Sequence, residues 1–338
     1  MALPALDDVR RHFAGARLAV AARAGLARVF TAVPGVDLVV PLASGGDIRK
    51  RLRADTDALR SARFELAILL PNAFYAAWVS RRAGIPARWG YRTDFRGAAL
   101  TRRVRRPRGT MHQGAYYQHL VHALGMASGP LRPHVVASDR DRIAGAGLLA
   151  REGWTPSSPL VGLAPGAAYG FAKQWPPDRF AGVARLLAGR GVWSVLVGLP
   201  ADRDAGRSVV SAFERPAGAA GAPLSGRLVN LIGRTDIGEL MGVMSHCASF
   251  VANDSGAAHL AAAIGLPVVA IFGPTDERIA APLAGRTFSG TNMALWQDVF
   301  CRPCGLRECP IDHRCMKRIA PERAFEAVME QLSARGVA

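Results

Sequence analysis

The 338-residue sequence lacks the features of a secreted, membrane-spanning or disordered chain. Its first 16 residues include Asp7 and Asp8 and do not resemble a secretory signal. The longest nearly uncharged stretch, 256–273, contains His259 and is interrupted by Pro267. It therefore predicts a helix and a buried strand, not a membrane span. Half of the residues are hydrophobic and 20% are charged, which excludes disorder. We expect a soluble cytoplasmic protein of about two domains.

Cysteine is scarce, and four of the five cysteines lie within residues 301–315. This grouping is too local for the disulfide framework of a secreted protein. Together with His313, the spacing Cys-x2-Cys-x4-Cys-x5-Cys offers enough ligands for tetrahedral zinc, although its second half is loose for a zinc ribbon. A reduced structural loop is the favoured interpretation, and a metal site and a redox or disulfide role are the alternatives.

Acidic residues are few. The sequence has 43 basic and 26 acidic residues, and its net charge is +17. Ten arginines fall within 81–108, where Asp94 is the only acid. Such a segment is either a solvated face or a contact surface for phosphates of nucleic acid or of an anionic membrane. The interleaved Trp89, Tyr91 and Phe95 suit stacking on RNA bases, or they belong to the core because the residues around them alternate as in a strand.

Short apolar runs alternate with helical patterns along both halves of the chain. The first half predicts strands at 17–22, 37–42, 66–71 and 87–91, and helices at 7–13, 47–60, 72–83 and 112–126. The second half predicts strands at 160–164, 193–197, 228–232, 250–252 and 268–272, and helices at 178–188, 202–213, 236–245, 256–264 and 321–333. Residues 128–158, with one helix near 139–153, are predicted as a linker. The pattern predicts an α/β fold of two Rossmann-like, doubly wound domains, 1–127 and 159–338, that face a cleft.

Loops that follow strands are the candidate sites, because ligands bind at the carboxyl ends of strands in such sheets. The segment Asn253-Asp254-Ser255-Gly256 leads from a strand into a helix whose first N–H groups and dipole suit an anion. Asp254 or Ser255 can cap this helix, and His259 lies on the same face near its start. Simple capping is the alternative interpretation.

A second loop, 164–177, contains both glycine and lysine. Gly166 allows the backbone to approach a phosphate closely, and Lys173 can neutralise it, although an ordinary turn with a solvated lysine is possible. Asp202, after the next strand, either holds a ribose hydroxyl or caps the following helix. The absence of G-x-G-x-x-G after a strand and of a Walker A motif argues against dinucleotide and P-loop sites.

In this order, these segments resemble the lipopolysaccharide heptosyltransferases, a family of ADP-heptose-dependent glycosyltransferases. The Asp-Ser-Gly-x-x-His element followed by Phe-Gly-Pro-Thr is highly specific, and the similarity spans essentially the whole chain. Residues 301–316 look like the branch that adds the second heptose. The segments that carry the resemblance are Pro165-Gly166-Ala167, Ala172-Lys173-Gln174-Trp175-Pro176, Leu231-Ile232-Gly233-Arg234-Thr235, Asn253-Asp254-Ser255-Gly256-Ala257-Ala258-His259 and Ile271-Phe272-Gly273-Pro274-Thr275-Asp276.

The resemblance implies the GT-B fold and an inverting reaction that needs neither a metal nor another cofactor. Heptose would move from ADP-L-glycero-D-manno-heptose to a heptosyl-Kdo-lipid A type acceptor of the lipopolysaccharide inner core. Residues 1–127 would bind the acceptor and 159–338 the donor. By resemblance, the donor site comprises Gly166, Lys173 at the diphosphate, Asp202 at the ribose, Thr235 near the adenine, and Asp254, Ser255, Gly256 and His259 at the helix start. Arg88, Arg92 and Arg96 are expected to contact the anionic acceptor.

The start of the chain departs from the family pattern. The family carries Gly-Asp at the end of a first strand, shortly before the residues matched by Pro4-Ala5-Leu6, and that aspartate is the expected general base. Since this sequence starts at Met1, we expect both strand and base to be absent. A cytoplasmic monomer at the inner-membrane surface, without a nucleic-acid partner, is the leading expectation. A GT-B enzyme for another nucleotide sugar and a basic nucleic-acid-binding protein are the alternatives.

Overall fold

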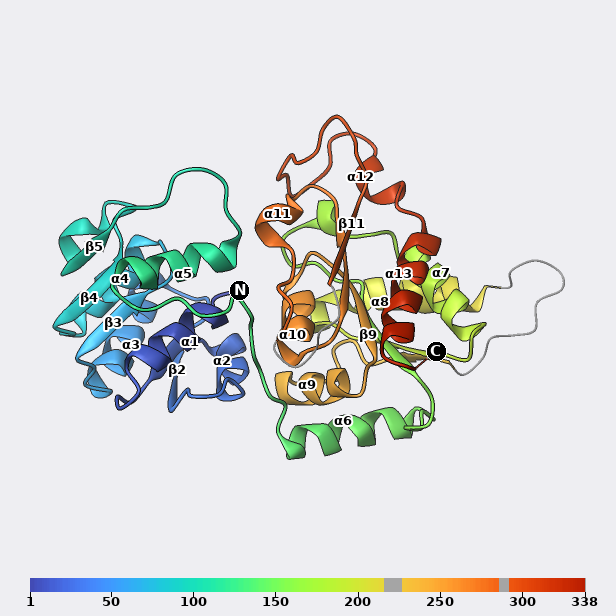
Figure 1. Ribbon diagram of the computed structural model, residues 1–338, viewed down its shortest axis with the longest axis horizontal. Coiled ribbons are helices and arrows are strands. Elements are labelled where there is room, and N and C mark those ends of the chain that lie inside the picture. The colour runs from blue at the N-terminus through green and yellow to red at the C-terminus, as the bar shows by residue number, and fades with distance from the viewer. Residues whose placement is uncertain (216–226, 286–291, 338) are drawn as a thin grey trace. The chain divides into compact units, whose positions relative to one another are not determined.

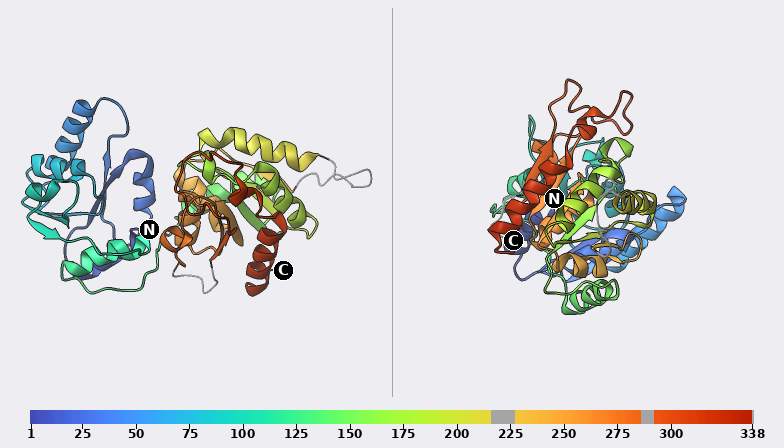
Figure 2. Two further views of the ribbon diagram at one scale, coloured as in Figure 1. Left: turned by 90° about the horizontal axis from the view of Figure 1, so that it is seen from above. Right: turned by 90° about the vertical axis from the view of Figure 1, so that its right-hand side faces the viewer.

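A computed structural model describes residues 1–215, 227–285 and 292–337 of the chain. These residues form two compact units, Met1–Arg132 and Pro133–Ala338. Each unit contains parallel strands covered by helices (Figures 1 and 2). Within the described ranges, no helix is both long and apolar enough to cross a membrane.

The second unit is built on one six-stranded parallel sheet, in the order β11-β10-β9-β6-β7-β8. Strands β10, β9 and β6 are buried along their whole length, because helices cover both faces of the sheet. Their mostly continuous apolar sequences follow from that burial. The strands are β6 (Leu160–Ala164), β7 (Trp193–Leu196), β8 (Leu228–Asn230), β9 (Ser249–Asn253), β10 (Val268–Phe272) and β11 (Met293–Trp296).

Two groups of helices cover this sheet. Helices α7, α8 and α13 share one hydrophobic cluster with the strands, and α9 and α10 lie on the opposite face (Figure 1). Helix α6 packs on α9, outside the sheet. Their bounds are α6 (Asp139–Arg151), α7 (Pro177–Ala188), α8 (Arg203–Glu214), α9 (Ile237–Ser245), α10 (Gly256–Ile264) and α13 (Pro321–Ala334).

Helix α6 lies within the segment predicted as a linker, and it packs closely on the second unit. The two helices meet at glycines: a Cβ atom added at Gly145 would lie 2.3 Å from the carbonyl carbon of Gly242. One added at Gly242 would lie 1.8 Å from the carbonyl oxygen of Asp141. Backbone therefore touches backbone at this crossing, and neither position has room for a side chain.

The first unit contains two separate parallel sheets, β1-β2 and β3-β4-β5. In the described part of the chain, β1 and β3 each keep one edge without a strand partner. Most of their residues are only half-buried, unlike the fully buried inner strands of the second unit. The elements are α1 (Leu3–His12), β1 (Ala19–Arg23), α2 (Ala24–Thr31), β2 (Leu38–Leu42), α3 (Ile48–Ser61), β3 (Leu66–Leu69), α4 (Phe74–Arg82), β4 (Ala87–Tyr91), β5 (Arg102–Val104) and α5 (Gln113–Ala123).

All the strands and helices expected from the sequence are present, with ends shifted by a few residues. The first helix begins at Leu3, earlier than predicted. The sequence missed α2, which follows β1 without a loop, and β5, in which two of three residues are arginine and no apolar run marks a strand. It also missed β11 and the short helices η1 (Arg96–Ala99), η2 (Phe171–Lys173), η3 (Pro200–Asp202), α11 (Glu277–Ala280) and α12 (Arg314–Lys317).

The contact between α6 and α9 gives a test of this packing. Gly145→Ala should lower the free energy of unfolding by about 1–3 kcal/mol, because the new methyl group forces the helices apart. Gly147→Ala is the matched control in the same helix, where the nearest atom to an added Cβ lies at 3.7 Å. It should be neutral or stabilising by about 0.5–1 kcal/mol, since alanine favours helix more than glycine does. Urea unfolding followed by circular dichroism measures both; equal effects would contradict the packing.

Candidate anion-binding site in the second unit

Three loops meet at the carboxyl ends of β6, β9 and β10, which are neighbours in the sheet. The Nζ atom of Lys173 donates a hydrogen bond to Oδ2 of Asp254 at 2.5 Å. The hydroxyl of Thr275 donates to the same oxygen at 2.7 Å. The side chains of Lys173 and Asp254 are only 12% and 6% exposed. Parallel strands end at a common edge, and this edge gathers a cation, a carboxylate and a hydroxyl from loops that are distant in sequence.

The buried Asn253 fixes the loop that carries Lys173. Its Nδ2 donates to the carbonyl oxygen of Pro165 at 2.8 Å, and its Oδ1 accepts from the backbone N–H of Trp175 at 2.9 Å. The buried Trp175 indole in turn donates to the carbonyl oxygen of Ile319 at 3.1 Å. Both ends of the loop are therefore anchored, and Lys173 holds a defined position between them.

The start of α10 is suited to receive an anion. Ser255 is the N-cap residue, yet its side chain caps nothing, and its buried Oγ atom has no hydrogen-bond partner in the described ranges. Gly256 is exposed, with no other group within 4 Å of the position a Cβ would take. His259 lies one turn further and is half-buried. A helix start offers unpaired N–H groups and the positive end of its dipole, so these residues and Lys173 form an anion-binding arrangement.

The side chain of Asp202 packs against Gly166, in the loop at the same edge of the sheet. A Cβ atom added at Gly166 would lie 2.2 Å from Cγ of Asp202, so only glycine allows the carboxylate to lie against this loop. Asp202 also accepts the backbone N–H of Leu199 at 2.8 Å and thereby caps its own turn. Thr235 is half-exposed in the loop after β8, at the same edge of the sheet. Within the described ranges, no hydrogen bond or ion pair joins Thr235 to the other candidate residues.

Sequence analysis missed the part played by residues 301–315, here called the cysteine segment. Its backbone binds the site loops. The hydroxyl of Tyr169 donates to the carbonyl oxygen of Gly305 at 2.8 Å, and the backbone N–H of Ala172 donates to the carbonyl oxygen of Arg307 at 2.9 Å. The N–H of Gly305 donates to the carbonyl oxygen of Pro274 at 2.8 Å. The segment thus ties the loops after β6 and β10 together. These contacts use backbone atoms, which leave no signature in sequence.

The cysteine segment also brings a second cation to the site. Nζ of Lys173 lies 4.7 Å from the centroid of the Tyr169 ring, and Cζ of Arg307 lies 5.1 Å from the same centroid. Arg307 is exposed. Both cations are attracted by the ring electrons of one tyrosine, which holds them near each other. More than 130 residues separate Tyr169 from Arg307, so no local pattern could have indicated the pairing.

The cysteines themselves are free thiols. Burial and the neighbouring thiols raise the pKa of Cys315 to about 11. Cys304 and Cys309 are exposed, and Cys301 is half-buried. No group of three or more histidine, cysteine or acidic residues in the described part of the chain could hold a metal ion, so the zinc interpretation has no ligand set there.

The arginines of the first unit differ from expectation. Arg96 is fully buried, and its guanidinium donates to the carbonyl oxygens of Tyr91, at 2.8 Å, and of Pro71. Arg88 donates to the carbonyl oxygen of Ala99 at 2.7 Å. These two side chains hold backbone together, which does not fit the expectation that they contact an acceptor, whereas Arg92 is exposed.

The aromatic side chains near these arginines divide between core and surface. Tyr91 is buried, and its hydroxyl donates to the carbonyl oxygen of Tyr116 at 2.8 Å, so it belongs to the core. Trp89 is half-buried, and Phe95 is fully exposed. The interpretation of all three as a platform for RNA bases is therefore wrong for Tyr91.

Comparison with known proteins identifies the family. The model of glycosyltransferase family 9 (heptosyltransferase) matches residues 52–313. Lipopolysaccharide heptosyltransferase 2 of Salmonella typhimurium is 28% identical over 321 residues, which are 90% of this chain and 86% of that protein. The protein of the same name from Escherichia coli is 29% identical over 263 residues, 75% of this chain and 72% of that one.

Solved structures confirm the fold class. The structure of Escherichia coli ADP-heptose lipopolysaccharide heptosyltransferase II superimposes with a TM-score of 0.80 at 24% identity, covering 99% of this chain and 95% of that one. An Escherichia coli heptosyltransferase solved with ADP gives a TM-score of 0.69 at 16% identity, covering 98% and 95%. The α/β fold is therefore of the GT-B type, with two Rossmann-like domains.

The thiols provide a test of the geometry around the cysteine segment. At pH 8 the exposed Cys304 and Cys309 should react with iodoacetamide well before Cys315. Because the pKa of Cys315 is raised to about 11, its thiol stays protonated at that pH, and the thiolate is the reactive form. Mass spectrometry of the labelled peptides measures the order, and Cys247, with a pKa raised by burial to about 12, is the internal control. Equally fast labelling of Cys315 would contradict its buried position.

Proposed function

Because the chain belongs to glycosyltransferase family 9, the heptosyltransferase family, we propose that it transfers heptose from ADP-L-glycero-D-manno-heptose to the inner core of lipopolysaccharide. Its being a glycosyltransferase of lipopolysaccharide biosynthesis follows from the family and from the named relatives. Those relatives are called heptosyltransferase 2, which supports a heptosyl-Kdo-lipid A type acceptor. The donor, the acceptor and the stereochemistry are our proposal.

One observation carries the proposal for the donor: Lys173 lies beside the start of α10, held there by Asp254. Transfer of a sugar from a nucleoside diphosphate leaves negative charge on the diphosphate as the glycosidic bond breaks. A fixed ammonium group and the N–H groups of a helix start stabilise that charge as it develops. A diphosphate bound here would compete with Asp254 for the ammonium group of Lys173. The unpartnered Ser255 hydroxyl supplies a further donor.

The rest of the donor fits the loops along the same edge. Asp202, which lies against Gly166, is proposed to accept hydrogen bonds from the ribose hydroxyls. The loop that contains Thr235 is proposed to lie along the adenine. Gly256 allows the diphosphate to approach the helix start closely, and His259 is proposed to line the site one turn further along α10.

The proposed reaction is a single displacement with inversion. A base removes the proton from an acceptor hydroxyl, and that oxygen attacks the anomeric carbon from the face opposite to the diphosphate. The bond to the diphosphate oxygen breaks, and ADP leaves with its electron pair. No step of this scheme needs a metal ion, because Lys173 and α10 supply the positive charge.

We propose that the general base is an aspartate at the end of a strand that pairs with β1 or β3, as the family resemblance implies. The partnerless edges of β1 and β3 support this proposal, because a parallel strand could pair with either. Most residues of these two strands are only half-buried, so a further strand could cover them.

The acceptor is proposed to bind the first unit, in the cytoplasm at the surface of the inner membrane, with the protein acting as a monomer and without nucleic acid. The supporting observation is charge: residues 1–132 contain 22 basic and 8 acidic residues, a net charge of +14 out of +17 for the chain. A phosphorylated lipid acceptor matches such a surface.

Substitution of Lys173 tests the donor site. Lys173→Ala should lower kcat by about 10²–10³, because one preorganised electrostatic contact to the leaving group is lost. Lys317→Ala, which removes an exposed lysine from α12, is the matched control and should leave kcat unchanged. Steady-state transfer from ADP-heptose is measured along with Tm, which separates lost charge from lost folding. Equal kcat in the two variants would refute the assignment.

Chelation tests metal independence. Transfer should be unaffected by EDTA, since the diphosphate charge is proposed to be balanced by Lys173 and the start of α10. If EDTA abolishes transfer and Mg²⁺ restores it, the proposed mechanism is wrong. A slow loss of Tm with release of zinc would instead favour the metal interpretation of the cysteine segment.

A further inference from the structure

The loop after β4, residues 92–98, presents a fully exposed phenyl ring. Phe95 has its whole side chain in solvent. Asp94 and Phe95 have φ angles of 45° and 56°, so two successive residues other than glycine adopt the left-handed conformation. This conformation is costly for residues with a Cβ atom and persists only where surrounding contacts impose it. The backbone thus holds an apolar ring in water.

Hydrogen bonds from the buried Arg96 hold the loop in this left-handed conformation. Its Nε donates to the carbonyl oxygen of Tyr91 at 2.8 Å, and another of its nitrogens donates to that of Pro71. The hydroxyl of Thr93 adds a bond of 3.1 Å to the carbonyl oxygen of Asn72. The loop is therefore tied to the end of β4 and to the segment after β3. Phe95 projects from a rigid base.

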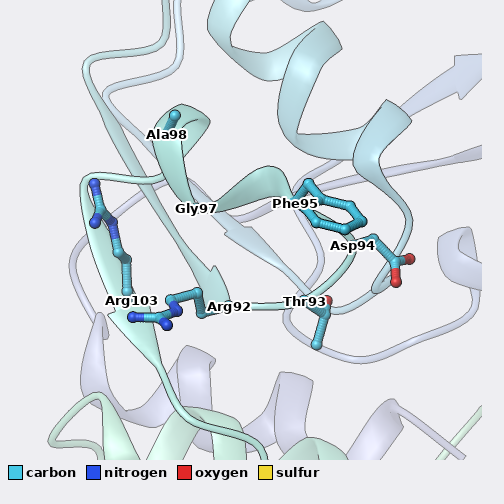
Figure 3. Close-up of a pocket in the computed structure, with 7 residues that line it drawn as sticks. All are labelled: Arg92, Thr93, Asp94, Phe95, Gly97, Ala98 and Arg103. Atoms are coloured by element: carbon cyan, nitrogen blue, oxygen red, sulfur yellow. The ribbon is translucent and has the colours of Figure 1, made fainter.

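Two arginines and one acid, Asp94, line the same hollow as the ring. Arg92, Arg103 and Phe95 line a hollow of about 520 Å³ that is open to solvent (Figure 3). In the described part of the chain, neither arginine side chain forms a hydrogen bond or an ion pair. Asp94 is the only acid between residues 92 and 132. The surface thus combines an apolar ring with two guanidinium groups that make no hydrogen bond or ion pair among the described residues.

We propose that Phe95, Arg92 and Arg103 form a docking surface for an anionic lipid bilayer. The guanidinium groups contact lipid phosphates, and the phenyl ring inserts between the headgroups, as aromatic side chains of peripheral proteins do. The loop lies at the carboxyl end of β4, the kind of edge at which parallel sheets bind ligands. The inference rests on the proposed function in one respect: if the acceptor is carried by a lipid, docking at this surface brings it to this edge of the sheet.

A nucleic acid fits this surface less well. Binding to single strands without sequence preference relies on several exposed rings along a basic groove. Here Tyr91 is buried, and Arg102 covers the ring of Trp89 with its Cζ 5.1 Å from the centroid. Of the three rings in this stretch, Phe95 alone is uncovered, which suits insertion into an interface better than stacking of successive bases.

Co-sedimentation with vesicles tests the proposal. The chain should bind vesicles that contain phosphatidylglycerol and not vesicles of phosphatidylcholine alone, and salt should weaken the binding. Arg92→Gln with Arg103→Gln should weaken partitioning about 30-fold, because each charge near an anionic surface contributes about fivefold. Phe95→Ser should weaken it about tenfold. Arg49→Gln with Arg53→Gln, on α3, and Phe300→Ser, which removes another exposed phenyl ring, are the matched controls and should bind as the parent does.

A fluorescent side chain reports the insertion directly. The emission added by Phe95→Trp should shift to shorter wavelength on binding and be quenched by brominated lipid. Emission that stays solvent-like while the chain sediments with vesicles would overturn the proposal, as would equal binding by Phe95→Ser and the parent. Tighter binding to RNA than to vesicles, lost on substitution of Arg92 and Arg103, would assign the surface to nucleic acid instead.

The same variants separate this inference from the proposed function. Transfer to a delipidated, water-soluble acceptor does not require a membrane. If Phe95→Ser and the parent bind vesicles equally and both transfer heptose, the docking surface is wrong and the function stands. If vesicle binding follows the expected pattern but no variant transfers heptose to either acceptor, the function is wrong and the docking surface stands.

Discussion

The hydrogen bonds made by the side-chain amide of Asn253 hold the candidate site in place. This amide is fully buried at the end of β9. Its nitrogen donates to Pro165 and its oxygen accepts from Trp175, one residue on each side of Lys173 in the same loop. A buried amide that loses its partners is costly, so this loop has little freedom to leave the sheet. The position of Lys173 beside Asp254 follows from that anchoring, and so does the alignment of the cation with the start of α10.

The electrostatics of the site show a balance between folding and binding. Lys173 and Asp254 are both largely buried, and each stabilises the charge of the other. The carboxylate also accepts from Thr275, so it stays bonded if the ammonium group turns toward an anion. The cysteine segment also adds Arg307, whose carbonyl oxygen accepts from Ala172 while its guanidinium lies over the ring of Tyr169. The backbone of this residue braces the loop, and its side chain is exposed to solvent.

The two units show how the continuity of a sheet governs burial. In the second unit each inner strand has two neighbours, and β6, β9 and β10 are buried from end to end. In the first unit the strands divide into two sheets, and β1 and β3 remain half-buried. Packing between helices depends on glycine as well, because α6 and α9 can cross only if Gly145 and Gly242 carry no side chain. Sequence periodicity indicates which strands are buried, but it does not indicate which glycines lie at a contact between helices.

The sequence alone determined the order of most strands and helices, because apolar runs are local patterns. The resemblance carried by motifs such as Asp254-Ser255-Gly256 implied the family and the GT-B fold, because such motifs are also local. The sequence also indicated Lys173, since a lysine after a glycine turn suits an anion. Only the tertiary structure decided that Arg96 is a buried anchor while Phe95 is exposed, although both lie in one arginine-rich stretch. It also decided that Tyr169 brings Arg307 to Lys173. The physical reason is that burial, and contacts between backbone groups distant in sequence, depend on which loops the sheet brings to a common edge, and no local pattern records that.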